Sequence, residues 1–158
     1  MNKYLQMLLK DTDMPVVFDY DGVLFEARWY VKRINMPDET EEKLLEAMRK
    51  GDNLYTEPIP YMRNFVSFKM HNKRIFVLSH IHNEIEYNFK LDQIHTYYPK
   101  ISKVMWATSV DDKIKHLQEV YDTFRRFIYI DDNHEALIKM ENHFDENCKF
   151  FHSSSLFV

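Results

Sequence analysis

Short apolar runs alternate with longer amphipathic segments along this chain, and this alternation constrains the fold more than any other feature. The runs cover residues 16–18, 75–78, 104–106 and 127–130, with a weaker fifth at 149–152. The segments with helical patterns are residues 38–50, 60–70, 83–95, 110–124 and 133–144. Apolar strands separated by amphipathic helices are typical of βαβ units around a buried parallel sheet. We therefore predict an α/β fold, a Rossmann-like three-layer sandwich with a mostly parallel central sheet.

Composition narrows the class of protein. The chain has 158 residues, the length of one domain, and its 29% of charged residues is ordinary for a globular protein. The net charge of −4 argues against a protein that coats nucleic acid. No segment has the roughly 20 apolar residues that cross a bilayer, and residues 1–13 do not have the pattern of a signal peptide. Since Cys148 is the only cysteine, we expect no intrachain disulfide and a cytoplasmic location.

Polar residues follow the predicted strands. In chain order they are Asp19, Asp21, Ser79, Thr108, Lys113, Asp131 and Asp132. Ligands of open α/β sheets bind outside the carboxyl ends of the strands, so we expect these side chains to lie at one edge. Any one of them alone is explained as the cap of the next helix. Four carboxylates gathered in a partly desolvated site would repel one another unless a cation held them.

These residue types suit phosphoryl transfer with a magnesium ion. Carboxylate oxygens are the ligands that Mg²⁺ prefers, and no histidine or cysteine stands at these positions. A carboxylate can attack phosphorus and form an aspartyl-phosphate, which water then hydrolyses. A second acid two residues further on can protonate the leaving oxygen and then activate that water.

Residues 16–24, with the sequence Val-Val-Phe-Asp-Tyr-Asp-Gly-Val-Leu, resemble the first signature of the haloacid dehalogenase-like superfamily. Ser79 resembles the second signature, Lys113 the third, and the adjacent pair Asp131 and Asp132 the fourth. The order and spacing of the four signatures agree over residues 16–132, which is most of the chain. The resemblance implies a magnesium-dependent phosphatase.

The resemblance also implies a role for each matching residue. Asp19 would be the nucleophile and a magnesium ligand, and Asp21 the general acid and base, with its main-chain carbonyl on the metal. Ser79 and Lys113 would hold the phosphoryl oxygens. Asp131 would bind magnesium, with Asp132 as a further ligand or as its support.

Several neighbouring residues have less certain roles. Lys115 is the alternative to Lys113, which we prefer because it is nearer the start of its predicted helix. His80 is expected to contribute to substrate binding, whereas no firm role is predicted for His82 or Asn133. Gly22 would let the chain turn sharply after the two acids.

One domain, residues 1–158, accounts for the chain, with residues 25–59 as a small cap inserted after the first strand. Residues 54–60 resemble the segment before the crossover helix in deoxyribonucleotidase-like members, which suggests a nucleotide or another small phosphomonoester as substrate. Trp29 and Tyr30 are candidate surfaces for stacking on a base. A small cap would also admit a phosphorylated macromolecule.

Two other classes of protein have similar residues. A receiver domain also combines acids, a hydroxyl and a lysine, but its acid pair comes early and its phosphoacceptor stands alone later, the reverse of the order here. A regulatory or binding module with the same fold and no turnover is the second alternative. The complete set of acids, hydroxyl and lysine favours the enzyme. The sequence does not indicate an oligomeric state.

Overall fold

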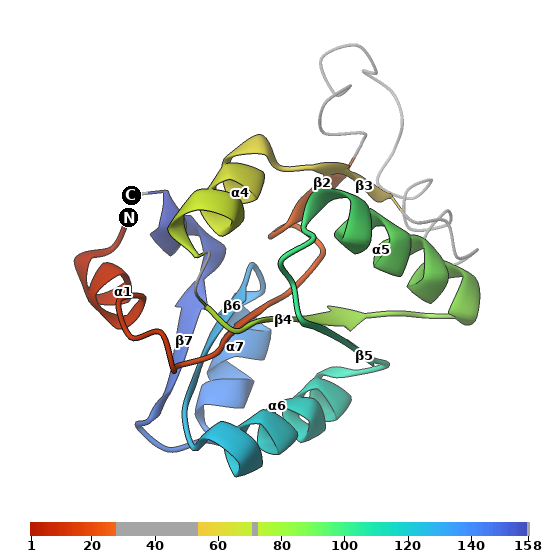
Figure 1. Ribbon diagram of the computed structural model, residues 1–158. Coiled ribbons are helices and arrows are strands. Elements are labelled where there is room, and N and C mark those ends of the chain that lie inside the picture. Colours follow the sequence, from red (N-terminus) through yellow and green to blue (C-terminus); the bar gives the residue numbers. More distant parts are fainter. Residues whose placement is uncertain (28–53, 71–72, 158) are drawn as a thin grey trace.

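The computed structural model describes residues 1–27, 54–70 and 73–157, and its centre is a five-stranded parallel sheet (Figure 1). The strands are β1 (Val16–Phe18), β4 (Ile75–His80), β5 (Lys103–Ala107), β6 (Phe127–Asp131) and β7 (Cys148–His152). Their spatial order is β5-β4-β1-β6-β7, and all four pairings are parallel. The predicted α/β class and parallel sheet are confirmed. β4 and β5 extend the sheet on one side of β1, and β6 and β7 then extend it on the other side.

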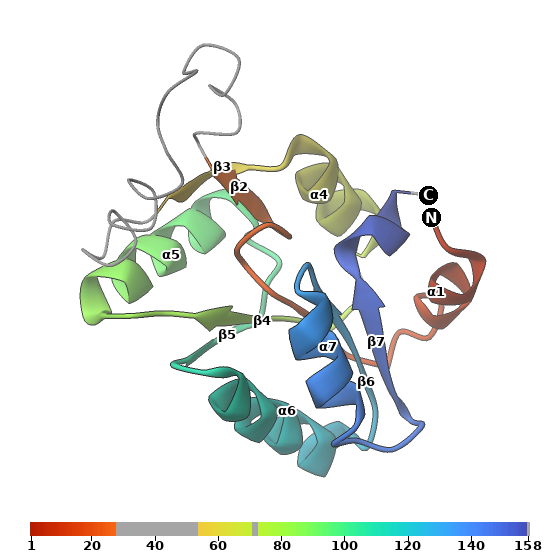
Figure 2. The same ribbon diagram turned by 180° about the vertical axis from the view of Figure 1, so that it is seen from behind.

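Helices cover both faces of the sheet (Figures 1 and 2). One face packs against α4 (Pro60–Asn64), the π-helical turn Phe65–Lys69 that continues it, α5 (Glu84–Tyr97) and α1 (Lys3–Leu8). The other packs against α6 (Val110–Phe124) and α7 (His134–Glu141). Val16 and Phe18 belong to the first core and Val17 to the second, because successive strand residues point to opposite faces. The predicted three layers are therefore present.

Polar caps begin the helices that follow β4, β5 and β6. The side chains of Asn83, Ser109 and Asn133 each accept a hydrogen bond from the N–H three residues further on. Capping therefore explains these three residues, whereas Asp19 and Asp131 are not caps. No helix within the described ranges is both long and apolar enough to cross a membrane.

The structure departs from the predicted elements in three places. The helix predicted for residues 60–70 widens into a π-helical turn at Phe65. The sequence analysis did not predict α1, nor the antiparallel ribbon of β2 (Phe25–Ala27) and β3 (Tyr55–Pro58). This ribbon joins the two ends of the predicted insertion, residues 25–59. The predicted helix 38–50, Trp29 and Tyr30 lie outside the described residues, so the cap stays a prediction.

Candidate active site

The loop after β1 turns back through Gly22, as the sequence predicted. Gly22 has a φ of 73°, in the left-handed region that favours glycine, and its N–H donates to the Phe25 carbonyl at 2.8 Å. A Cβ atom at this position would overlap the carboxylate of Asp132. Glycine is therefore required both for the turn and for the close approach of the loop to the end of β6.

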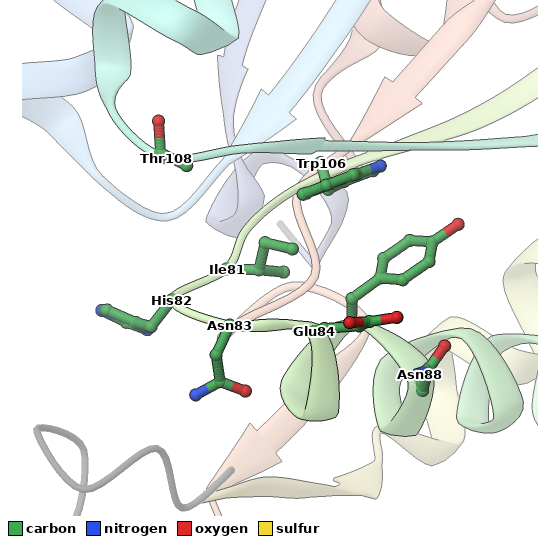
Figure 3. A pocket seen from close by; sticks show the side chains of 8 residues that line it. Ile81, His82, Asn83, Glu84, Asn88, Trp106 and Thr108 are labelled. Atoms are coloured by element: carbon green, nitrogen blue, oxygen red, sulfur yellow. The ribbon is translucent and has the colours of Figure 1, made fainter.

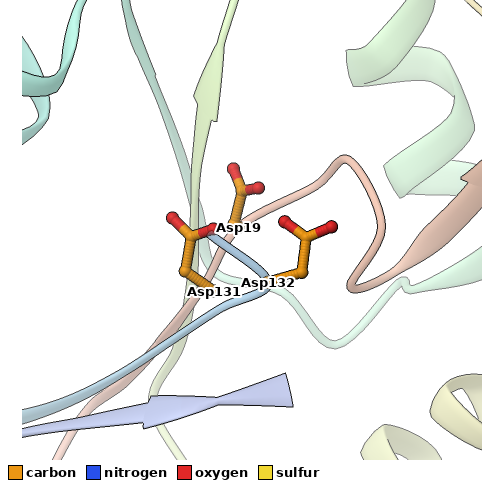
Figure 4. A group of neighbouring side chains, drawn as sticks. All are labelled: Asp19, Asp131 and Asp132. Carbon is orange, nitrogen blue, oxygen red and sulfur yellow. The ribbon is translucent and has the colours of Figure 1, made fainter. Parts of the chain in front are cut away.

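Three carboxylates meet at the carboxyl ends of β1 and β6 (Figure 4). One oxygen from each of Asp19, Asp131 and Asp132 lies within 4.8 Å of the others. Asp19 is 5% exposed and Asp131 is 1% exposed, whereas Asp132 is exposed. The Asp19 N–H donates to the Ile130 carbonyl at 2.9 Å, and Asp131 Oδ1 accepts from the Asn133 N–H at 3.0 Å. The main chain therefore helps to fix the two buried acids.

Lys113 on α6 places a cation beside the two buried acids. Its Nζ donates to Asp19 Oδ1 at 2.9 Å and to Asp131 Oδ2 at 3.3 Å. It also lies 3.2 Å from the hydroxyl of Tyr129, which donates to Asp131 Oδ2 at 2.6 Å. Lys115 is exposed. Of the two candidate lysines, the structure thus brings Lys113 into the cluster.

One lysine does not compensate three carboxylates. Burial raises the pKa of Asp19 to about 7, with Lys113 opposing the rise and Asp131 adding to it. Burial and then the charge of Asp131 raise the pKa of Asp132 to about 6. Burial alone would lower the pKa of Lys113, but Asp19 and Asp131 raise it. Among the described residues, the groups of this cluster therefore leave an excess of negative charge, which favours a bound cation.

The composition of this cluster fits magnesium. Its three candidate ligands are all carboxylates, and no histidine or cysteine joins the group among the residues that the structure describes. Mg²⁺ prefers hard oxygen ligands and usually keeps several waters when one or two carboxylates bind it. Asp19, Asp131 and Asp132 are three of the four residues predicted as metal ligands, and their side chains would hold the ion. The Asp21 side chain lies outside this group.

A cavity of about 190 Å³ opens onto the acidic cluster. Its lining comes from the ends of β1, β4 and β6 and from the starts of α6 and α7: Asp19, Asp21, His80, Ser109, Val110, Lys113, Asp131, Asp132, Asn133 and Ala136. Burial, and then the charge of neighbouring His82, lowers the pKa of His80. A neutral imidazole therefore borders the cavity next to the acids.

Asp21 and Ser79 are turned toward α5. Lys90 Nζ donates to Asp21 Oδ2 at 3.1 Å and to Ser79 Oγ at 3.0 Å, and the Ser79 hydroxyl donates to the His80 carbonyl. Ser79 is buried and does not line the cavity, whereas Asp21 does. Burial raises the pKa of Asp21, and Lys90 opposes the rise. The predicted roles of these two residues remain predictions.

Lys90 is a residue of this site for which the sequence predicted no role. It stands four positions after Glu86 on a predicted helix, and the two side chains lie 3.1 Å apart. That spacing is also typical of exposed ion pairs on helix surfaces. The sequence pattern therefore indicates the pair but not its burial.

A second cavity, of about 350 Å³, lies between the start of α5 and the end of β5 (Figure 3). It is lined by Ile81, His82, Asn83, Glu84, Tyr87, Asn88, Trp106 and Thr108. The rings of His80 and His82 lie 4.7 Å apart, and each borders one cavity. Trp106 is 47% exposed, and its ring lies 5.0 Å from that of Tyr87. Trp106 and Tyr87 therefore supply aromatic surface to the second cavity, and the contact between His80 and His82 connects the two cavities.

Comparisons with known proteins bear on the fold. No family profile matches the sequence, and no curated protein matches it. The structure is similar to a crystal structure from Burkholderia xenovorans LB400, whose assignment as a haloacid dehalogenase-like hydrolase is itself an inference. The TM-score is 0.53 at 12% sequence identity, with 87% of this chain and 81% of that chain covered. At this identity the match supports the haloacid dehalogenase-like fold that the sequence motifs imply.

Proposed function

We propose that this protein is a magnesium-dependent phosphomonoester hydrolase with Asp19 as its nucleophile. One observation carries the proposal: Asp19 is buried at the end of β1, in contact with Lys113 and within 4.8 Å of two further carboxylates. A structural role does not explain a third acid beside one lysine, because like charges in a desolvated site raise the energy of the ionised state. A site that holds a cation and a phosphoryl group does explain it.

The first step transfers the phosphoryl group to Asp19. A carboxylate oxygen of Asp19 forms a bond to phosphorus while the bond from phosphorus to the ester oxygen breaks. Asp21, on the wall of the same cavity, gives its proton to the departing oxygen. Lys113 neutralises charge on the phosphoryl oxygens. A magnesium ion held by Asp19, Asp131 and Asp132 would supply further charge neutralisation to the phosphoryl group.

The second step regenerates Asp19. Asp21, now ionised, accepts a proton from a water molecule, whose oxygen bonds to phosphorus as the bond to Asp19 breaks. Phosphate and the free carboxylate result. His80 borders the cavity, where it would contact the substrate, and the Ser79 hydroxyl would have to rotate away from the His80 carbonyl to do so.

The proposed substrate is a small phosphorylated metabolite such as a nucleotide. The cavity lined by Trp106 and Tyr87 supports this choice, because it offers aromatic surface for a planar leaving group and His82 on its wall contacts His80 at the acidic cavity. Asn83, Asn88 and Thr108 add hydrogen-bonding groups on the same wall. The resemblance of residues 54–60 to deoxyribonucleotidase-like members points the same way.

Hydrolysis of p-nitrophenyl phosphate tests the proposal. We expect the purified protein to release phosphate with Mg²⁺, to stop with EDTA and to recover on addition of Mg²⁺. Asp19→Asn keeps the size of the side chain and should abolish turnover, while Lys115→Met, at an exposed position, should retain it.

A panel of phosphorylated metabolites and one phosphopeptide then identifies the substrate class. Turnover of the phosphopeptide alone would indicate a macromolecular substrate. Absence of turnover on every ester would favour a non-catalytic binding module and contradict the proposed enzyme.

A further inference from the structure

Lys90 on α5 is a buried cation whose ammonium group contacts several polar groups at once. Its side chain is 2% exposed. The Nζ atom lies 2.9 Å from Asp21 Oδ1 and 3.1 Å from Asp21 Oδ2. It lies 3.1 Å from Glu86 Oε1, and it donates to Ser79 Oγ and to the His80 carbonyl, both at 3.0 Å. The ammonium group thus joins helix α5 to the ends of β1 and β4.

Stability alone does not explain this lysine. Removing an ammonium group from water is costly, and well-packed apolar residues can often replace a buried ion pair without loss of stability. Ile94, one turn further along α5, is an apolar core residue. A role in the site therefore explains the charge at position 90 better than stability does.

The partners of Lys90 are themselves held in place. Glu86 Oε2 accepts from the N–H of His82 at 2.7 Å and lies 3.0 Å from His82 Nδ1. Burial alone would raise the pKa of Glu86, but Lys90 and the His82 hydrogen bonds outweigh it and lower the pKa. The ring of Tyr20 lies on another side of the ammonium group, 4.7 Å from Nζ. Lys90 consequently has little freedom to move, and neither has the carboxylate that it contacts.

We propose that Lys90 is a positioning residue that holds the Asp21 carboxylate in its working orientation. The inference rests on the proposed function, in which Asp21 protonates the leaving oxygen. Lys90 does not line the cavity, whereas Asp21 does, so Lys90 acts through Asp21 rather than on the substrate.

Loss of this positioning role should slow some phosphate esters more than others, whereas general damage to the fold would slow all of them. An ester whose leaving group is a stable anion needs little proton donation to the leaving oxygen. An ester with a basic leaving group depends on the proton that Asp21 donates. A misplacement of about 1 Å can reduce a rate on the order of 100-fold. Lys90→Met should therefore slow the release of phenol from phenyl phosphate by roughly 10- to 100-fold, and slow 2,4-dinitrophenyl phosphate much less.

Single-turnover release of the leaving group is the measurement, because it reports the first step before water attacks the phosphorus of the aspartyl-phosphate. Wild type, Lys90→Met, Asp21→Asn and the double variant are compared on both esters, with Lys115→Met as the matched exposed control. In the Asp21→Asn background, Lys90→Met should have little further effect on phenyl phosphate. Thermal melts confirm that each variant is folded, and Lys90→Gln replaces Lys90→Met if the latter is not.

The possible results separate the two proposals. Equal losses on the two esters in folded variants, or independent effects of Lys90→Met and Asp21→Asn, would overturn the positioning role while leaving the phosphatase intact. A wild-type protein that releases neither phenol nor dinitrophenol would overturn the proposed function, and the role of Lys90 with it.

Discussion

Replacing Lys113 with methionine tests the electrostatics of the acidic cluster directly. The ammonium group lies 2.9 Å from Asp19 and 3.3 Å from Asp131, and all three residues are buried. Methionine keeps most of the volume and removes the charge. Removal of one partner from a buried ion pair destabilises a protein by about 3–5 kcal/mol. With roughly 2–4 °C of Tm per kcal/mol for a chain of this size, we expect Tm to fall by about 6–20 °C.

The size of this loss depends on pH. The pKa of Asp19 is already raised to about 7, and Lys113 is the main influence that opposes the rise, so the pKa increases further in Lys113→Met. A carboxyl with a raised pKa binds protons more readily in the folded than in the unfolded state. The folded variant therefore gains relative stability as the pH falls. The Tm deficit should be largest near about pH 8 and smaller near about pH 5.

Thermal unfolding followed by circular dichroism measures the Tm deficit of Lys113→Met, first with EDTA and then with Mg²⁺. At about 100 times its Kd, a ligand that binds only the folded state stabilises it by about 2.7 kcal/mol. Lys115→Met is the control and should stay within about 0.5 kcal/mol of wild type, because its side chain is exposed. A deficit for Lys113→Met no larger than that of the control, or one that grows as the pH falls, would refute the reasoning.

Two further predictions concern the proposed metal site. Gly22→Ala should lower stability by about 1–2 kcal/mol through its left-handed backbone alone. It should also weaken Mg²⁺ binding, because the new Cβ would displace the Asp132 carboxylate; unchanged affinity by isothermal titration calorimetry would contradict that close approach. In wild type, Asp19 and Asp132 have pKa values of about 7 and about 6, so Mg²⁺ affinity should fall between about pH 8 and about pH 5.5 as both take up protons. Constant affinity over that range would remove these two carboxylates from the site.

The parts of the site that follow from strand ends can be predicted from the sequence. Asp19 and Asp131 each stand at the end of an apolar run, and a parallel sheet brings such ends to one edge. The convergence of these two acids can therefore be predicted without knowledge of side-chain packing. Lys113 is predictable for a similar reason, since it stands in the first turn of a helix that begins at that edge, after its cap Ser109.

The remaining parts depend on tertiary contacts that no local pattern records. The β2–β3 ribbon pairs Phe25 with Pro58 and Glu26 with Glu57, and neither short strand has a continuous apolar run. The pattern of Lys90 and Glu86 fits a solvated helix surface equally well. Only the packing of α5 over β4 decides that this pair is buried.

The two aspartates of the motif after β1 pair with lysines from opposite faces of the sheet. Asp19 contacts Lys113 on α6, and Asp21 contacts Lys90 on α5. Their work differs in the proposed reaction: the first must present an ionised oxygen to phosphorus, and the second must give and then take a proton. Carboxylates can take different roles when their surroundings differ. Helices on both faces of a single sheet can reach its carboxyl edge, so two acids that are close in sequence can each have a cation of their own. A chain that placed α5 and α6 on the same face could not separate the two acid–lysine pairs in this way.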